Sequence, residues 1–384
     1  MDRRAVLGLV TVVGIGGIVA CGSMGRAHGA SALDFDEGGY RVESATVKVG
    51  RTRKTVKYRL YSGVPYAADP VDPAREKLSV RVPVEVDGMA IDPGRAPIIM
   101  NTASGDVEPV AENRIALASG LVVVTSRVRD TAWNGIVDLK AAVRYVHHNK
   151  GRLPGDVGRI VASGSGKAGG LAALAGASAG RGQYDDDLRR IGAARSSDRI
   201  YAVAANMPVT EIGKADLAYD RNLLLAKYLE PAGARYLKRL PEDDRSLYLK
   251  RNSWIDWMHG RISFAYDDLL DLLDQVGNRR AKGLAASAKP APVLRSAMDF
   301  VRQRNPQRAR HWWLRTGTDG TDVPLTVIGS LTTGLRSLGD DVDVDWDATV
   351  NRGDTVNRDD SADMGTAVAS QAVAWIDGTV ARRS

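Results

Sequence analysis

The sequence predicts an α/β protein with a mostly parallel sheet, an N-terminal antiparallel β-extension and an inserted helical segment. Three observations predict this class. Apolar and polar residues alternate after Tyr40, as in antiparallel strands; short apolar runs separated by helical patterns follow; and a helix-rich segment begins near residue 211. With 384 residues, 44% of them hydrophobic, the chain can bury a sizeable core, and its composition is not that of a disordered protein or a disulfide-stapled mini-fold.

The first thirty residues have the pattern of an export signal. Asp2-Arg3-Arg4 precede an apolar stretch over residues 5–20, which is shorter than the roughly twenty residues that a membrane-spanning helix needs. Ile18-Val19-Ala20-Cys21 resembles a bacterial lipobox, and the paired arginines resemble a twin-arginine signal.

We therefore expect residues 1–21 to be a signal peptide and residues 22–36 a flexible tether. Cys21, the one cysteine of the chain, is expected to carry a lipid. The protein would then be exported and lipid-anchored on the extracytoplasmic face of the cell membrane. The alternative is a buried cysteine behind an uncleaved anchor.

Residues 37–210 are expected to form the first part of the core. Alternation in residues 41–49, 56–61 and 78–86 predicts antiparallel strands. Helical spacing of apolar residues predicts a helix over residues 136–148. Four continuous apolar runs predict strands buried on both faces, as in a parallel sheet: residues 96–100, 121–124, 159–162 and 200–203.

Residues 211–310 are expected to form a helical cap, and residues 311–384 the second part of the core. From Lys214 to Arg310 there are nineteen Lys and Arg against twelve Asp and Glu, whereas the chain from His311 onward has six basic and twelve acidic residues. A basic cap could favour anionic ligands or a membrane surface, but a solvated helical face accounts for it better. No basic patch with interleaved aromatic residues indicates nucleic-acid binding.

The aspartates that alternate with apolar residues over 341–347 could suggest a calcium site. A β-strand with one polar face explains them better. We expect no metal and no cofactor.

A glycine-rich turn follows the third apolar run. Residues 159–171 read as a strand, a turn and a helix start, and this geometry lifts one side chain above the sheet. Backbone N–H groups of the turn and helix would be free to stabilise an oxyanion. Hydrolases place a serine there.

Several stretches together carry a resemblance to a known family. They are APIIMNT at 96–102, IVDLKAAVRY at 136–145, PGD at 154–156, AGG at 168–170, MPVT at 207–210, ADLAY at 215–219 and HWWLRTG at 311–317. They resemble the bacterial tannase and feruloyl-esterase-like branch of the α/β hydrolases, over about three quarters of the chain. The resemblance implies an α/β-hydrolase fold.

The catalytic triad of that family does not carry over. Aligned on Ala-Gly-Gly, the nucleophile position falls on Lys167, and aligned on the preceding strand it falls on Gly166. The position of the triad acid becomes Gly320, while a second aspartate, which resembles a substrate-contacting residue of tannases, is kept as Asp322. The position of the histidine becomes Asn351.

The histidines offer no obvious substitute for the missing base. Of His28, His147, His148, His259 and His311, only His259, in the expected cap, could face the cleft. The oxyanion loop also departs from the family pattern, because Asn101-Thr102 is followed by Ala103-Ser104-Gly105-Asp106, and a carboxylate there opposes a developing negative charge.

Three hypotheses follow. In the first, the protein binds a small organic ligand, phenolic or polyketide-like, between cap and core, or promotes a cyclisation or elimination there with Lys167, Asp106 or Asp322. In the second, Ser165 acts as an esterase or amidase nucleophile with an unusual base such as Lys167 or His259. In the third, the cap of a non-catalytic surface protein binds a macromolecule.

Whether the protein is an enzyme stays open. An enzyme would be a divergent α/β hydrolase without a Ser-His-Asp triad. The expected catalytic candidates are Ser165, Lys167 and Asp322. The expected ligand-binding or oxyanion region comprises Asn101, Ser104, Gly105, Asp106, Gly166, Ala168, Asp216, His259 and Asn351.

Overall fold

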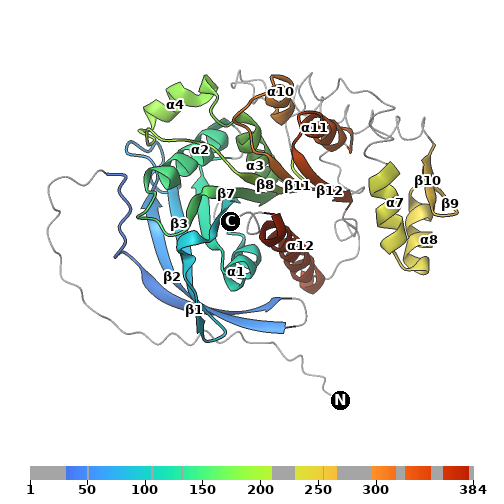
Figure 1. Cartoon of the computed structure of the whole chain (residues 1–384), viewed down its shortest axis with the longest axis horizontal. Coiled ribbons are helices and arrows are strands. Elements are labelled where there is room, and N and C mark those ends of the chain that lie inside the picture. The colour runs from blue at the N-terminus through green and yellow to red at the C-terminus, as the bar shows by residue number, and fades with distance from the viewer. Residues whose placement is uncertain are drawn as a thin grey trace, which may run out of the picture. The chain divides into compact units, whose positions relative to one another are not determined.

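The structure, a computed structural model, describes residues 32–49, 52–104, 108–130, 133–209, 230–253, 255–265, 296–316, 325–346 and 358–379. A mixed sheet forms the centre of the part that begins at Leu33 (Figure 1). Its strands are β1 (Arg41–Val49), β2 (Thr52–Pro65), β3 (Lys77–Val86), β4 (Met89–Ala90), β5 (Pro97–Ser104), β6 (Val122–Val128), β7 (Asp156–Ser165), β8 (Ala202–Asn206), β11 (His311–Thr316) and β12 (Asp341–Trp346).

The strand order is β1-β2-β3-β6-β5-β7-β8-β11-β12, with β4 paired to β3. The strands β1, β2 and β3 pair antiparallel, and β3 pairs antiparallel with β6. From β6 to β12 every neighbouring pair is parallel. The predicted α/β class with a mostly parallel sheet is therefore confirmed.

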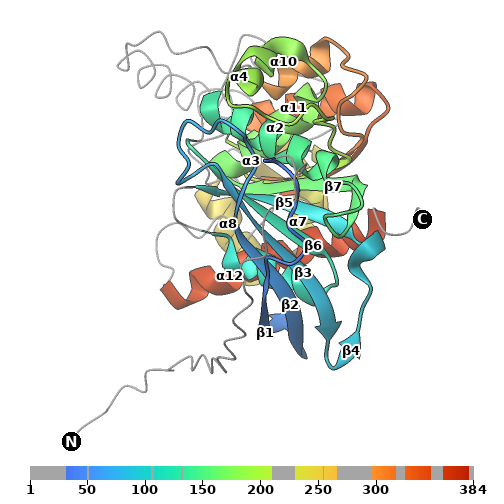
Figure 2. The ribbon, with the colours of Figure 1, turned by 90° about the vertical axis from the view of Figure 1, so that its left-hand side faces the viewer.

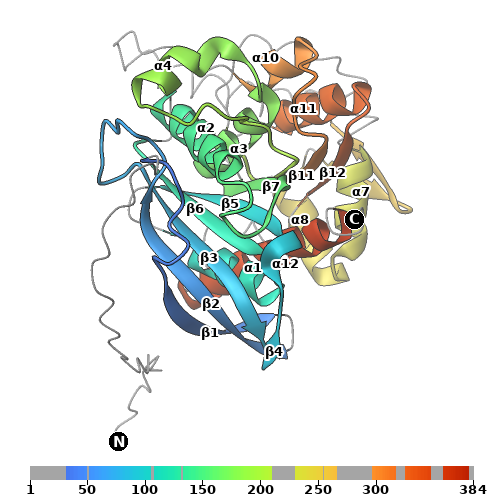
Figure 3. The ribbon, with the colours of Figure 1, turned by 60° about the vertical axis from the view of Figure 1, so that its left-hand side comes forward.

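Helices cover both faces of the sheet (Figure 3). One face carries α1 (Val110–Ala118) and α12 (Arg358–Thr379), whereas α2 (Trp133–His148), α3 (Lys167–Ser178), α10 (Ala297–Arg302) and α11 (Leu325–Ser337) cover the other. The sequence of β5 is continuously apolar because both of its faces are buried. Ile98 and Met100 pack with residues of α2 and α3, while Ile99 packs with residues of α1 and α12.

Glycine lets α3 lie close to the sheet. A Cβ at Gly176 would collide with the side chain of Val203 on β8 and approach Trp312 on β11. On the far side of α2 lies the short helix α4 (Asp185–Arg190). At the start of α3, Gly164 of β7 approaches Ala168 and Gly169 approaches Asn206 of β8, so the turn that precedes the helix is placed relative to both strands.

The described part of the expected cap contains α7 (Glu230–Arg239), α8 (Glu242–Arg251) and a hairpin of β9 (Ile255–Met258) with β10 (Arg261–Phe264). The helix α7 contacts the end of β12, because Arg235 donates to the carbonyl oxygen of Val344 at 3.0 Å and Arg239 pairs with Asp345 at 2.6 Å. The helix α10 also lies in the range assigned to the cap, but it packs with α3 and α11.

The packed part of the chain begins before β1. Asn149, just after α2, donates to the carbonyl oxygen of Leu33 at 2.9 Å and accepts from the N–H of Phe35 at 2.8 Å. The side chains of Leu33 and Phe35 are buried (Figure 2 shows this segment leading into the sheet). Residues 33–36, assigned to the tether from sequence, thus pack on the core. Among the described residues, no helix is both long enough and apolar enough to span a membrane.

Candidate functional site

The glycine-rich turn lies where β7 ends and α3 begins. Ser165 is the last residue of β7, Lys167 is the first of α3, and Gly166 alone stands between them. Gly166 has φ 58° and ψ −123°, a conformation that glycine adopts without the steric cost that other residues incur. Among the described residues, no heavy atom lies within 4 Å of the position that a Cβ at Gly166 would take, so no described residue covers the apex of the turn.

The residues around the apex are tightly placed. The N–H of Gly166 donates to the carbonyl oxygen of Asn206, at the end of β8, at 3.0 Å. Its own carbonyl oxygen accepts from the N–H of Val209 at 2.8 Å. A Cβ at Gly164 would lie 2.6 Å from the carbonyl carbon of Ala168, so strand and helix approach too closely for a side chain there.

The helix start offers backbone donors. The first N–H groups of a helix have no partner inside it, and they lie at the positive end of the helix dipole. Within the described part of the chain, no acceptor pairs with the N–H of Lys167 or Ala168. These two groups can therefore receive an oxygen atom of a ligand.

Ser165 and Lys167 flank the apex and are both exposed. The hydroxyl of Ser165 accepts from the side-chain amide of Asn206 at 3.4 Å. The other amide atom, Oδ1 of Asn206, is buried and has no hydrogen-bond partner among the described residues. No ion pair of Lys167 occurs within the described residues. Asn206 is a polar residue beside the turn that the sequence pattern did not single out.

Asn101 lies on β5, but its side chain takes part in a different arrangement. It is buried, and its amide donates to Oδ1 of Asn113, on α1, at 2.7 Å. Its side chain is therefore directed toward the face covered by α1, whereas α3 covers the opposite face. Ser104 ends β5, in register with Val128 of β6.

Two hydroxyl groups near the carboxyl edge were missed by sequence reasoning. Thr102 of β5 and Ser126 of β6 are register partners, and both hydroxyl oxygens are buried without a hydrogen-bond partner in the described part of the chain. Serine and threonine are common in strands, so nothing in the sequence distinguished them from ordinary core positions.

None of the described histidines forms a hydrogen bond or an ion pair with the residues of the turn, 164–168. His259 is at the tip of the β9–β10 hairpin, with φ 51°, and is exposed. His311 begins β11 and so lies at the amino ends of the parallel strands, whereas Gly166 lies at their carboxyl ends. The ring of His311 stacks on Tyr201. His147 contacts the carbonyl oxygen of Arg199 at 2.9 Å, and His148 lies 3.6 Å from Asp34.

The other candidates, Cys21, Gly105, Asp106, Asp216, Gly320, Asp322 and Asn351, lie outside the described residues. Within the described ranges, no group of three or more His, Cys, Asp or Glu side chains is arranged to hold a metal ion.

A buried acidic cluster follows β6. Arg129 donates to both carboxylate oxygens of Asp138 on α2, at 2.6 Å and 3.1 Å, and also lies 3.6 Å from Glu76. Burial, with the nearby charge of Glu76, raises the pKa of Asp138 to about 6, although the hydrogen bonds from Arg129 oppose this change. The cluster joins α2 to the segment before β3, on the side of the sheet that carries α3.

Comparisons with known proteins give one kind of match. No family model matches the chain, and no curated protein matches its sequence. Among solved structures, native tannin acyl hydrolase from Lactobacillus plantarum is 23% identical, with a TM-score of 0.60, covering 90% of this chain and 98% of that one.

Two further solved structures are similar. A tannin acyl hydrolase in complex with ethyl gallate is 21% identical, with a TM-score of 0.57, covering 88% of this chain and 99% of that one. The tannase of Fusobacterium nucleatum is 19% identical, with a TM-score of 0.54, covering 89% and 99%. At this identity the similarity shows a tannase-like α/β-hydrolase fold.

Proposed function

We propose that this protein is a tannase-like member of the α/β-hydrolase fold that has lost the serine triad. It binds a small organic ligand between the cap and the carboxyl edge of the sheet, or promotes a non-hydrolytic reaction there. The observation that carries the proposal is the residue at the apex of the β7–α3 turn. In α/β hydrolases this turn holds the nucleophile. Here it is Gly166, which has no side chain.

The geometry of the turn supports the alignment based on the preceding strand, in which Gly166 occupies the position of the nucleophile. Only Gly166 stands between strand and helix, whereas Lys167 already belongs to α3. Ser165 belongs to β7 and is held by Asn206. A hydroxyl group without a base is a weak nucleophile, and no described histidine contacts the turn.

The retained features favour binding of an oxygen atom. The N–H groups of Lys167 and Ala168 have no acceptor among the described residues. They lie in the first turn of α3, where a ligand oxygen can accept from them. The solved tannin acyl hydrolases bind ethyl gallate and 3,4-dihydroxybenzoate. Both molecules have a carbonyl or carboxylate group on a phenolic ring, so we propose a phenolic or polyketide-like ligand of this class.

Two probes test the proposal: 3,4-dihydroxybenzoate for binding, measured by calorimetry, and ethyl gallate for hydrolysis, measured as released gallate. We expect binding without hydrolysis. A fluorophosphonate probe should leave the protein unlabelled. Hydrolysis or labelling that is lost in Ser165→Ala would instead establish the esterase or amidase reaction of Ser165. Absence of both binding and labelling would favour the non-catalytic surface protein.

A substitution at the apex makes the test specific. Because a Cβ at Gly166 points into open space, Gly166→Leu should fill the ligand site and weaken binding of 3,4-dihydroxybenzoate at least about tenfold. Gly151→Leu is the matched control, since Gly151 also has a positive φ and open space around its Cβ position. Equal loss in both variants would mean that backbone strain, and not occupation of the site, causes the effect.

We also propose that the protein is exported and anchored to the cell membrane through Cys21. The support is the arginine pair, the short apolar stretch and the lipobox-like residues before Cys21.

A further inference from the structure

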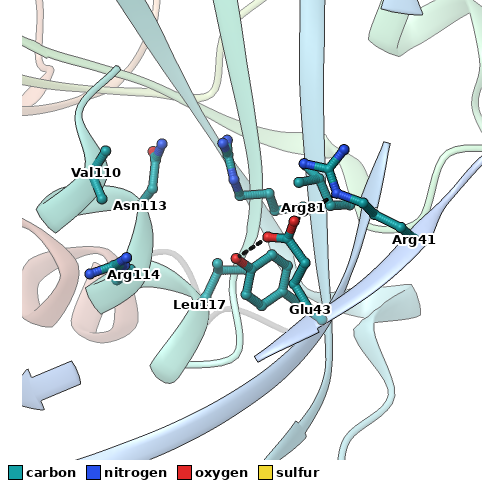
Figure 4. A pocket seen from close by; sticks show the side chains of 9 residues that line it. Arg41, Glu43, Arg81, Val110, Asn113, Arg114 and Leu117 are labelled. Atoms are coloured by element: carbon teal, nitrogen blue, oxygen red, sulfur yellow. Dashed lines mark hydrogen bonds and ion pairs between the residues drawn. The ribbon is translucent and has the colours of Figure 1, made fainter. Parts of the chain in front are cut away.

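A pocket lies on the face of the sheet covered by α1 (Figure 4). Its volume is about 220 Å³. Strands β1, β2 and β3 form one wall and α1 forms the other. The lining residues are Arg41, Glu43, Tyr58, Leu60, Arg81, Val110, Asn113, Arg114 and Leu117. The turn at Gly166 leads into α3, on the opposite face, so the two places are separate.

Buried polar side chains hold part of the lining in place. Asn101 donates to Oδ1 of Asn113, the amide of Asn113 donates to the hydroxyl of Thr125 at 3.2 Å, and Arg81 donates to the same hydroxyl at 3.3 Å. In this arrangement the nitrogen end of the Asn113 amide is the donor toward Thr125. Asn113 is 3% exposed, and within the described chain the second hydrogen of its amide nitrogen has no acceptor.

The charges that line the pocket favour an anion. Arg41, Arg81 and Arg114 contribute three positive charges, and Glu43 contributes one negative charge. Arg81 is paired with Glu108 behind the lining, so one net positive charge is left. Arg114 has no ion pair within the described residues.

Glu43 does not oppose an anion with a free charge. Its carboxylate accepts from Arg41 at 2.7 Å and from the hydroxyl of Tyr58 at 2.8 Å, as the dashed lines of Figure 4 show. Burial alone would raise the pKa of Glu43, but these hydrogen bonds outweigh it and hold the pKa below its ordinary value. Each oxygen of the carboxylate thus has a donor, and Arg41 compensates its charge.

Apolar groups form the rest of the lining. Leu60 and Leu117 belong to the buried cluster on this face, and Val110 lies at the start of α1. We infer that this pocket binds a small organic monocarboxylate. Its carboxylate takes hydrogen bonds from the guanidinium groups and from the free amide hydrogen of Asn113, and its apolar part contacts Leu60 and Leu117.

Calorimetry with benzoate tests the inference, because benzoate combines one carboxylate with an apolar ring. We expect Arg114→Gln and Arg41→Gln each to weaken benzoate binding about tenfold, the usual effect of losing a charge-assisted hydrogen bond. Arg53→Gln is the matched control: Arg53 is an exposed arginine of β2 outside the pocket, and its loss should leave the affinity unchanged. Benzylamine, which has the same ring and the opposite charge, should not bind.

Three outcomes would overturn the inference. Equal weakening in Arg53→Gln would mean that the net charge of the protein attracts the anion. Binding of inorganic phosphate that is tighter than that of benzoate would mean that the apolar wall has no role. Loss of benzoate binding in Gly166→Leu but not in Arg114→Gln would place the carboxylate at the β7–α3 turn; this result would overturn the inference and support the proposed function.

Discussion

Lys140, on α2, shows how this chain buries a charge. It is 1% exposed, and its ammonium group donates to Asp198 at 2.9 Å and to the carbonyl oxygen of Ser178 at 3.0 Å. Burial lowers the pKa of Lys140, and the neighbouring Asp198 opposes that change. A buried ion pair whose partners are both hydrogen-bonded is tolerated, but removal of one partner leaves an uncompensated charge.

We therefore expect Lys140→Met to lower the free energy of unfolding by about 3 kcal/mol, because Asp198 stays buried without its main partner. Urea unfolding followed by circular dichroism measures the change. Lys150→Met, at an exposed position two residues beyond α2, is the control and should change stability by less than about 0.5 kcal/mol. A small effect at both positions would show that Asp198 is compensated by other groups.

The sequence predicted those site residues that are contiguous in the chain, and not those whose role depends on a contact with a distant element. The turn at residues 164–170 could be predicted because strand, glycines and helix are contiguous in the chain. The side-chain direction of Asn101 could not, because it depends on Asn113, a residue on another element. Asn206, beside Ser165, was missed for the same reason, since these two residues are 41 positions apart.

At the scale of elements, the apolar runs were reliable guides to the strands. The predicted runs at 159–162 and 200–203 lie within or next to β7 and β8, and the predicted helix over 136–148 corresponds to α2, Trp133–His148. The aspartates over 341–347 fall largely on β12. The docking of residues 33–36 was not predictable, because Asn149 holds them from more than a hundred residues away.

The contact between α2 and the segment after β6 makes stability depend on pH. Burial raises the pKa of Asp138 to about 6, above the ordinary value of 3.8, so the folded protein binds this proton more tightly than the unfolded chain does. The stabilisation is present below pH 4 and is lost as the pH rises toward 6. It amounts to about 3 kcal/mol, because each tenfold difference in proton affinity between the two states contributes about 1.4 kcal/mol.

We therefore expect the free energy of unfolding of the wild type to fall, relative to that of Asp138→Asn, between pH 4 and pH 6. Urea unfolding at half-unit steps of pH measures this difference. Asp186→Asn, which changes an exposed carboxylate on α4, is the control and should give a difference that is nearly constant with pH. A wild type that gains stability relative to Asp138→Asn over this range would mean that Arg129 outweighs burial.

The whole molecule combines a basic segment over residues 214–310, which was expected to form a cap, with an acidic C-terminal part. From sequence alone the basic residues of the cap were expected to form a solvated face, yet two arginines of α7 contact β12, where Arg239 pairs with Asp345 and Arg235 reaches Val344. The charge difference between the two parts therefore also contributes to their contact. An exposed pair of this kind contributes about 0–1 kcal/mol, so it orients α7 more than it stabilises the molecule.

Anchoring is a property of the whole chain and is testable by one substitution. We expect Cys21→Ser to move the protein from the membrane fraction to the soluble fraction of the cell envelope, because the thiol that would carry the lipid is removed. Fractionation with immunodetection measures the distribution, and mass spectrometry of the wild type should find a lipid-modified Cys21. Unchanged membrane association of Cys21→Ser would support an uncleaved anchor.

The hydrogen bonds of Asn149 to Leu33 and Phe35 also limit the length of chain that can separate the folded part from Cys21. Under the proposed anchoring, residues 22–32 alone connect the lipid to the first clamped residue. A fully extended chain gains at most about 3.6 Å per residue, so this linker is no longer than about 40 Å. The folded body would sample only a thin layer of solvent beside the bilayer, and any ligand would have to reach it there.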